Sequence, residues 1–450
     1  MKIPTPGETV RAFAEVFAQN GFSLYLVGGA VRDCCLGRRN GDFDFTTDAL
    51  PSDVQRIFRR VIPTGIKHGT VTVLFKGGQF EVTTFRSEAG YSDSRHPDRV
   101  EFVSSLEEDL KRRDFTINAL AVRLPGNEVL DYHHGLDDLK TGLIRCIGVP
   151  EERFFEDALR MLRACRFSAV LDFSIEQETL RAISRLSRNI SLVSTERIAD
   201  ELSKTLMADY PCKGIEYMRT TGLLKLILPE LQECFGVQQL GFHHEDVYGH
   251  CLSTLQLAAD ARWPLELRMA CLLHDIAKPL CRSASAQDGH YTFYNHDAKG
   301  AQITRSILRR LKFSNAFTDK VCALVANHMF NYSPDWTDGA IRRFISRCGK
   351  ENVQDVLLLR LADMRAITPD ADPTPVAELK QRIDAMPQPV LTVNALAIRG
   401  EDLTGLGLKP GPLYSEIKNF LLQQVLDRPE LNNREALLKI TRKYLENRNE

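Results

Sequence analysis

Short apolar and alternating segments in the first third of the chain predict a small sheet with helices. Ser23–Val27 is a compact apolar run, and Asp42–Phe45 alternates acidic with aromatic side chains. Thr70–Phe75 and Gln79–Phe85 flank a Lys-Gly-Gly turn, which is typical of a β-hairpin. Pro51–Val61 is amphipathic and opens with turn and capping residues, so it predicts a helix between the strands.

From Pro150 onward the apolar positions follow helical spacing with little interruption. The predicted helices span Phe154–Ala169, Glu176–Ser187, Thr195–Met207 and segments near 250–260, 265–277, 297–311, 316–329 and 352–367. A proline-bearing stretch at Thr368–Pro375 predicts a linker, and a helical tail follows from Leu413. The pattern predicts an α+β chain, with a small mixed-sheet head at 1–148 and all-α parts at 149–215, 216–370 and 371–450.

Composition is that of an ordinary folded protein. The 450 residues exceed the size at which single cores usually stop growing, so two or more domains are expected. The net charge is −1, so a polyanionic partner must be held by a local basic patch. Because no apolar run reaches roughly 18 residues and the first residues lack signal-peptide features, we expect a cytoplasmic protein without a membrane partner. The eleven scattered cysteines favour reduced, buried thiols.

Two short motifs in the head carry residues suited to phosphate and metal. Gly28-Gly29 lies between a predicted strand and a predicted helix that carries Arg32, so backbone amides and a guanidinium can meet an anion there. A tight strand–helix turn is the alternative. Asp42 and Asp44 share one face of a strand, because side-chain direction has period two. Such a carboxylate pair predicts a Mg²⁺ site for phosphoryl transfer, with a solvated loop as the alternative.

Four motifs in chain order resemble those of class II tRNA nucleotidyltransferases, the CCA-adding enzymes of the DNA polymerase β superfamily. They are Gly28–Asp33, the Asp42-x-Asp44 pair, Leu110–Leu120 and Glu156–Arg160. The resemblance implies a nucleotidyltransferase head with Mg²⁺, a neck that selects the nucleotide, and a helical body and tail that hold the tRNA acceptor end. It also implies that Gly29, Arg32 and Arg113 bind the nucleotide, with Asp114 orienting Arg113.

The segment Glu156–Arg166 predicts a protein template for C and A. On a continuous helix Asp157, Arg160 and Arg163 cover a stripe about 120° wide, with Arg166 nearly opposite Asp157. A carboxylate beside a guanidinium complements the amino group and ring nitrogen that cytosine and adenine share, and it rejects uracil and guanine. The resemblance assigns base selection to Asp157 and Arg160 and phosphate contacts to Arg163 and Arg166, although the angle of Arg166 fits least well. A surface salt bridge is the alternative.

Other charged residues of the chain leave two interpretations open. Glu81 is either a third carboxylate near the metal or a surface residue of an edge strand. The polar segment Ser87–Arg99 predicts a mobile loop, which in the family helps the change from C to A addition. Two basic helix faces either contact RNA phosphates or are solvated. They comprise Arg305, Arg309, Arg310 and Lys312, and Arg342, Arg343, Arg347 and Lys350.

Seven of the eleven histidines lie between His243 and His328. The order and spacing of His250, His274, Asp275 and Asp363 resemble the HD phosphohydrolase superfamily. Imidazole and carboxylate ligands from separate helices suit a divalent or transition metal that activates water against a phosphoester. A helical fold that has lost hydrolysis is the alternative. His296 and His328 either ligate a second metal or have a structural role in their helices, and the sequence favours the structural role. His243 and His244 are expected in a loop.

The sequence therefore predicts template-independent addition of CCA to tRNA from CTP and ATP, with an additional phosphohydrolase activity on cyclic or terminal phosphates of RNA ends. One alternative is the A-adding enzyme of a split system, which would keep the loop at Ser87–Arg99. Another is a bacterial poly(A) polymerase, against which the Ile62–Val71 region and the lack of a strongly basic C-terminal extension argue. A third is an HD phosphohydrolase whose head only binds RNA. No obligate protein partner is predicted.

Overall fold

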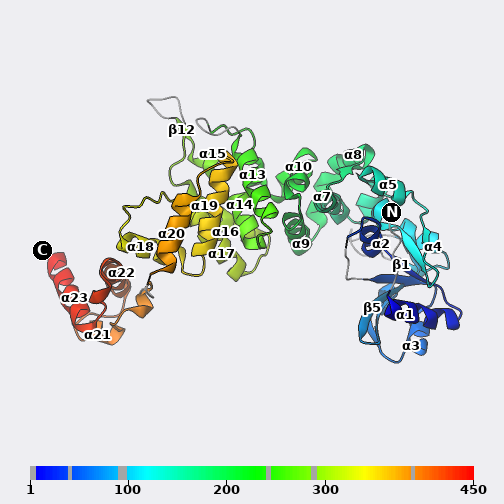
Figure 1. The fold of residues 1–450 in the computed structure, drawn as a ribbon, viewed down its shortest axis with the longest axis horizontal. Helices are drawn as coiled ribbons and strands as arrows, with labels where there is room; N and C mark the ends of the chain where they lie inside the picture. Colours follow the sequence, from blue (N-terminus) through cyan, green and yellow to red (C-terminus); the bar gives the residue numbers. More distant parts are fainter. Residues whose placement is uncertain are drawn as a thin grey trace. The chain divides into compact units, whose positions relative to one another are not determined.

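The computed structural model describes residues 7–38, 43–89, 99–239, 245–284, 291–386 and 391–449 (Figure 1). The chain divides into two compact units, Met1–Pro229 and Glu230–Glu450. The structure thus gives two units, whereas the division into four domains expected from the sequence stays a prediction. Among the described residues, no helix is both long and apolar enough to cross a bilayer.

A seven-stranded mixed sheet forms the centre of the head. Its strand order is β3-β4-β5-β2-β1-β8-β9, and all neighbours are antiparallel except the parallel pair β2 and β5. The strands are β1 Leu24–Val27, β2 Asp44–Thr47, β3 Val61–Gly65, β4 Thr70–Phe75, β5 Gly78–Thr84, β8 Ala121–Leu124 and β9 Glu128–Leu130. The predicted hairpin is confirmed, with Lys76 and Gly77 at positive φ in its turn.

Helices cover the sheet and bury its aromatic side chains. In α1 (Glu8–Gln19) the buried Phe13 packs against Phe45 and Phe80 of the sheet. Other helices of the head are α2 Gly29–Cys35, α3 Pro51–Ile57, α4 Leu106–Lys111 and α5 Gly135–Thr141. The helix expected to reach Val61 ends earlier, because Phe58 adopts an extended conformation and Val61 begins β3.

The polar segment Ser87–Arg99 is only partly described. Its ends lie in an antiparallel pair, β6 Arg86–Ala89 and β7 Arg99–Phe102. The mobile loop predicted for Ser87–Arg99 is therefore shorter than expected, because Ser87–Ala89 and Arg99 belong to paired strands. Residues 90–98 lie outside the described residues.

The remainder of the first unit is helical. It comprises α6 Pro150–Glu156, α7 Leu159–Leu171, α8 Gln177–Leu186, α9 Thr195–Leu206, α10 Pro211–Thr220 and α11 Leu223–Ile227, with short β10 Leu143–Ile144 and β11 Ser174–Ile175. The predicted continuous helix Phe154–Ala169 is wrong, because Asp157 has extended backbone angles (φ −145°, ψ 104°) and separates α6 from α7. Because of this break, the side chains before and after Asp157 do not follow one helical periodicity.

The second unit begins with a bundle whose helices pack through buried apolar faces. The helices are α12 Pro229–Gln232, α13 Val247–Asp260, α14 Leu265–Leu273, α15 Lys278–Cys281, α16 His296–Arg310, α17 Asn315–Asn327, α18 Asp338–Cys348, α19 Val353–Ile367 and α20 Thr374–Asp384. A two-stranded ribbon pairs β12 Ser283–Ala284 with β13 Tyr291–Thr292. The linker predicted at Thr368–Pro375 is shorter than expected, because α20 begins at Thr374 with Pro375 in its first turn, where proline is tolerated.

The C-terminal part has a core of its own, made by α21 Gly400–Thr404, α22 Pro412–Asp427 and α23 Arg434–Asn449. Arg342 on α18 donates hydrogen bonds to the Leu426 and Asp427 carbonyl oxygens at 2.6 and 3.1 Å, and Arg343 pairs with Asp427. Arg305 and Arg310 pair with Asp319 and Glu230. These arginines form ion pairs and hydrogen bonds within the unit, and Arg305, Arg310 and Arg343 remain partly exposed to solvent. Whether the two basic faces also contact RNA stays a prediction.

The cysteines behave as the sequence predicted. All eleven are free thiols, and eight of them are buried. Burial raises the pKa of the Cys165 thiol to about 12, which keeps it protonated and unreactive.

Candidate active site and metal centre

A pocket of 450 Å³ opens in the first unit, between the sheet of the head and the helices that follow it. Its walls contain seven arginines and three aspartates, so positive charge is in excess, as a polyphosphate ligand requires. The lining residues are Gly28, Gly29, Arg32, Asp44, Arg112, Arg113, Asp114, Asn118, Asp157, Leu159, Arg160, Arg163, Arg166, Phe167 and Arg197. Every head and neck residue predicted to bind nucleotide lines this pocket.

The turn between β1 and α2 brings backbone into the pocket. Gly28 has φ +73°, and a Cβ at this position would lie 3.2 Å from Nη1 of Arg113. The absence of a side chain therefore lets Arg113 approach the turn closely. Arg32 is buried, and its guanidinium donates to Asp33 at 2.8 Å and to Oδ1 of Asn118 at 2.7 Å. Arg32 is a fixed positive charge in the wall.

Asp44 is the first residue of β2 and lies beside Glu81 on the neighbouring strand. The two residues are register partners in the parallel pair β2 and β5. Burial and the charge of Asp44 raise the pKa of the Glu81 carboxyl above its usual value. β5 lies inside the sheet, so Glu81 is not on an edge strand, but its side chain is exposed, as the surface interpretation expected. Its register partner is the candidate metal ligand Asp44. Asp42 lies outside the described residues.

Two adjacent residues after α4 have different partners. Arg113 Nη2 lies 3.8 Å from Oδ2 of the buried Asp109, and burial lowers the pKa of the Arg113 guanidinium. Asp114 instead accepts hydrogen bonds from Arg163 at 2.7 Å and from Asn118 at 3.0 Å. The expectation that Asp114 orients Arg113 is therefore wrong, because its carboxylate faces α7. Burial alone would raise the pKa of Asp114, but Arg163 and Asn118 outweigh it and hold the value at about 2.

The residues expected to read the base have separate partners. Asp157 accepts a hydrogen bond from the Leu159 amide at 3.0 Å, and its other oxygen lies 2.7 Å from Nη2 of Arg197. Arg160 donates to the carbonyl oxygens of Arg153 and Arg112, both at 3.0 Å, and to Glu156 at 2.5 Å. Both side chains line the pocket, but each is held by other groups of the protein.

Arg166 lies in the same pocket as Asp157, although helical geometry placed it nearly opposite. That expectation is wrong because it assumed a helix through Asp157, whereas α7 begins only at Leu159. The Nε of Arg166 donates to Glu201 at 2.6 Å, and Arg163 lies 3.9 Å from the same carboxylate.

The sequence analysis missed Arg197 and Glu201, which lie one turn apart on α9. Arg197 contacts Asp157, and Glu201 contacts Arg166. The sequence signal that could have identified Glu201 is a charged residue on the apolar face of an amphipathic helix. In the structure Glu201 is 2 % exposed.

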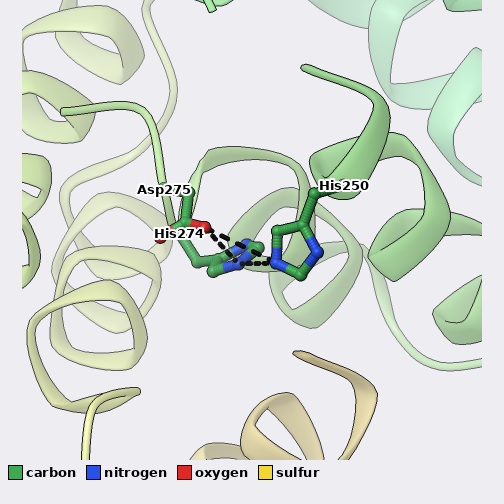
Figure 2. Close-up of side chains that lie close together, drawn as sticks. All are labelled: His250, His274 and Asp275. Atoms are coloured by element: carbon green, nitrogen blue, oxygen red, sulfur yellow. Dashed lines mark hydrogen bonds and ion pairs between the residues drawn. The ribbon is translucent and has the colours of Figure 1, made fainter. Parts of the chain in front are cut away.

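In the second unit the structure brings together the four predicted metal ligands. His250 lies on α13, His274 and Asp275 follow α14, and Asp363 lies on α19; all four are buried. His250 Nε2 is 3.1 Å from His274 Nε2, 3.0 Å from Asp363 Oδ1 and 3.5 Å from Asp275 Oδ2. Figure 2 shows the two imidazole rings and the Asp275 carboxylate meeting at one point. That they bind a metal stays a prediction.

Three further residues join this cluster. His296 Nε2 and His328 Nε2 lie 3.3 and 3.7 Å from Oδ1 of Asp275, so the preferred packing role for these histidines is not supported. His296 and His328 are 32 residues apart in the sequence, so their contact was not predictable from local spacing. It arises because α16 and α17 pack together. Lys278 Nζ lies 2.6 Å from Oδ2 of Asp275. Burial alone would raise the pKa of the Asp275 carboxyl. The nearby His274 and Lys278 lower it by more, so that this pKa lies well below its usual value. His243 and His244 lie outside the described residues.

A pocket of 470 Å³ lies against this cluster. Asp275, His296 and Asp363 contribute to its wall, together with Lys278 and Arg360. Arg360 Nη1 donates to Asp363 Oδ2 at 2.7 Å. Two cationic side chains beside candidate metal ligands suit an anionic group such as a phosphate.

Three family descriptions match successive parts of the chain. Residues 24–145 match the Poly A polymerase head domain, residues 172–235 the "Probable RNA and SrmB-binding site of polymerase A", and residues 292–441 tRNA nucleotidyltransferase domain 2. The first match contains Asp44, Arg113 and the β1–α2 turn, and the third contains His296, His328 and Asp363.

Relatives and a solved structure match over nearly the full length. The CCA-adding enzyme of Ligilactobacillus salivarius is 35 % identical over 448 residues, covering 99 % of this chain and 98 % of the relative. That of Enterococcus faecalis is 36 % identical over 441 residues, covering 97 % and 95 %. The crystal structure of the Bacillus stearothermophilus CCA-adding enzyme in complex with CTP is 30 % identical, covers 98 % of both chains and has a TM-score of 0.70. The chain belongs to the family of CCA-adding enzymes.

Proposed function

We propose that this protein adds C, C and A to the 3′ end of tRNA, using CTP and ATP without a nucleic-acid template and releasing pyrophosphate. The observation that carries the proposal is the arginine-rich pocket, whose wall combines Asp44 with Asp157 and Arg160. Full-length similarity to CCA-adding enzymes supports it, and the Bacillus relative binds CTP.

A divalent cation belongs to this chemistry, and we assign Mg²⁺ to Asp42 and Asp44, with Glu81 as a neighbouring carboxylate. The raised pKa of Glu81 beside Asp44 fits such a site, because two adjacent carboxylates favour a bound cation between them. When bound, Mg²⁺ neutralises charge that develops on the phosphate during transfer. The protein's contribution is to hold Asp44 at the pocket wall, with Glu81 beside it on the adjacent strand.

The triphosphate is assigned to the arginines of the pocket. Arg32 and Arg113 lie near the turn that contains Gly29, and Arg163 and Arg166 extend from α7. Asp114 and Glu201 hold the latter two guanidinium groups by hydrogen bonds of 2.7 and 2.6 Å. Prearranged guanidinium groups orient the α-phosphate for attack by the tRNA 3′-hydroxyl and stabilise the leaving pyrophosphate.

Base selection is assigned to Asp157 and Arg160. A carboxylate accepts from the exocyclic amino group of C or A, while a guanidinium donates to the ring nitrogen. Uracil and guanine present the opposite order, so that acceptor would face acceptor at Asp157 and donor would face donor at Arg160. Arg197 holds Asp157 at the pocket wall, so that the carboxylate is oriented before the base arrives.

The direct test supplies a tRNA that ends at the discriminator base with CTP alone, ATP alone, or both. We expect two added nucleotides, none, and three, read as product length on a gel. Long A tails from ATP alone would instead identify a poly(A) polymerase, and addition of A only to tRNA ending in CC would identify the A-adding enzyme of a split system. Asp44→Asn should abolish addition, whereas Asp200→Asn, on the exposed surface of α9, should not.

A second activity, metal-dependent phosphohydrolysis, is favoured by the cluster of His250, His274, Asp275 and Asp363. Buried imidazole and carboxylate groups this close together suit a divalent or transition metal, which activates water when bound. Lys278 and Arg360 line the adjoining pocket, and we assign the phosphate of an RNA end to them.

The test compares hydrolysis of 2′,3′-cyclic phosphates by two variants, with Mn²⁺ or Ni²⁺ supplied. We expect His274→Ala to lose hydrolysis and keep nucleotide addition, and Asp44→Asn to do the reverse. If His274→Ala hydrolyses at the wild-type rate, the second activity is refuted. If Asp44→Asn retains nucleotide addition, the interpretation of the head as a mere RNA-binding module gains support.

A further inference from the structure

Largely apolar side chains form a further part of the pocket beside the histidine cluster. They are Phe293, Tyr294, Met329 and Ile367. Tyr294 is 78 % exposed and Met329 is 44 % exposed, although both side chains are large. Exposed apolar side chains that gather at one pocket, next to a few polar groups, are typical of a ligand-binding surface.

The backbone that carries two histidines of the cluster also places the two exposed side chains. Tyr294 lies between β13 and α16, two residues before His296, whose Nδ1 donates to the Phe293 carbonyl oxygen at 2.7 Å. Met329 follows His328, whose Nδ1 donates to a carbonyl oxygen of α17 at 2.8 Å. The hydrogen bonds that orient the rings therefore also fix the backbone next to Tyr294 and Met329.

Two cations link the carboxylates of the cluster to the apolar side chains. Lys278 Nζ lies 2.6 Å from the Asp275 carboxylate and 5.5 Å from the centre of the Phe293 ring. Arg360 Nη1 donates to the α19 carboxylate of the cluster at 2.7 Å and lies 3.8 Å from the sulfur of Met329. The pocket therefore presents carboxylates, then cations, then apolar side chains.

A nucleotide at an RNA end presents groups that match this order. Its phosphoester is anionic, and its base has a flat apolar face. Unstacked bases of RNA stack on aromatic side chains, and the thioether of methionine packs favourably against aromatic rings. The pocket volume of 470 Å³ is that of a small-molecule site. A base with its attached phosphate therefore fits both the charge and the apolar surface of the pocket.

We propose that Tyr294 and Met329 bind the base of the terminal nucleotide by stacking, while Lys278 and Arg360 bind its phosphate. The inference rests on the proposed phosphohydrolase activity and names its substrate class, which is nucleotides with a cyclic or terminal phosphate in preference to phosphoesters without a base. Because every base has a π-face, this pocket accepts all four bases. It differs in this respect from the nucleotide pocket of the head, where a carboxylate and a guanidinium select C and A.

The test compares hydrolysis of adenosine 2′,3′-cyclic phosphate and of glycerol 1,2-cyclic phosphate, which has no base, by the full-length protein with Mn²⁺ or Ni²⁺. The wild type should have a KM at least about tenfold lower for the adenosine compound. Tyr294→Ala should raise that KM about tenfold with little change in kcat, and should leave hydrolysis of the glycerol compound unchanged. Tyr294→Phe should keep the wild-type KM, as should the matched control Tyr210→Ala, which replaces an exposed tyrosine of the first unit.

Binding in the absence of metal gives a second readout. The fluorescence of 2-aminopurine riboside 2′-monophosphate falls when its base stacks on an aromatic ring. In EDTA, Tyr294→Ala should quench this fluorescence less than Tyr210→Ala does. Any binding by the head is the same in both variants, so the difference reports the pocket of the second unit.

The outcomes separate this inference from the activity on which it rests. An unchanged KM for the adenosine compound in Tyr294→Ala, with unchanged quenching, would overturn the base site and leave the phosphohydrolase activity intact. Equal loss of activity on both cyclic phosphates in Tyr294→Ala would also overturn it, because a base site affects only the substrate that has a base. If the wild type hydrolyses neither compound, the phosphohydrolase activity is refuted and the inference fails with it.

Discussion

At the scale of single residues, the candidate active site is a network of paired charges rather than a set of isolated ligands. Asp114 holds Arg163, Glu201 holds Arg166, and Arg197 holds Asp157. The residue types were predictable from local motifs, but these pairings were not. Asp114 and Arg163 are 49 positions apart, and nothing in the sequence specifies which of several arginines a given carboxylate will meet.

Replacing Asp114 with Asn should reduce stability in a pH-dependent manner. The folded-state pKa of about 2 lies below the ordinary 3.8, so the charged carboxylate contributes stability above about pH 4, and this contribution is lost as the pH falls toward 2. The shift corresponds to on the order of 2 kcal/mol at pH 7. Calorimetry should show a Tm lowered by about 4–8 °C between pH 7 and 5, with the difference narrowing below pH 4. A difference that widens in acid would contradict this assignment.

At the scale of elements, turns and helix ends decide where the charges point. The hairpin of β4 and β5 was predictable because its glycine turn is a local signal. The break at Asp157 was not, because Glu156-Asp157-Ala158-Leu159 has nothing that forbids a helix. The start of α20 was not predictable either, because its first-turn Pro375 was interpreted as part of a linker. Local propensity limits the conformations that a segment can adopt, whereas tertiary packing determines which of them forms.

Gly28→Ala tests the close approach of the β1–α2 turn, and Gly37→Ala is its matched control. Both glycines have positive φ, +73° and +72°, so each substitution strains the backbone, and the strain is greater at Gly28, whose ψ of −138° lies outside the left-handed helical region. Only at Gly28 would the new Cβ meet Arg113, at 3.2 Å, since Gly37 has open space. We expect an increase of at least about tenfold in the KM for CTP in Gly28→Ala alone, equivalent to about 1.4 kcal/mol. Equal KM values in both variants would exclude this role of the turn.

At the scale of the whole molecule, each compact unit contains one candidate site. The nucleotide pocket lies within Met1–Pro229 and the histidine cluster within Glu230–Glu450. The α+β class was predictable because the hydrophobic pattern changes from alternation to helical spacing near residue 150. The assembly of the histidine cluster was predictable only in part, because packing of α16 against α17 brings two additional imidazoles into it.

Two units with separate cores should unfold in two calorimetric transitions. CTP with Mg²⁺ should raise the Tm of one transition, and Mn²⁺ alone should raise that of the other, because a ligand stabilises the unit that binds it by about 2.7 kcal/mol at one hundred times its Kd. His274→Ala should abolish the Mn²⁺ effect and leave the CTP effect unchanged. One cooperative transition that responds equally to both ligands would show that the units are coupled.

The central claim is that protein side chains, rather than a template strand, choose the incoming base. The most direct measurement is the ratio of kcat/KM for CTP to that for UTP on tRNA lacking CCA, in the wild type and in Asp157→Ala, with Asp200→Ala as the control on the surface of α9. We predict a preference on the order of 10⁴ in the wild type and in the control, and about 10² or less in Asp157→Ala. An unchanged preference in Asp157→Ala would contradict the account.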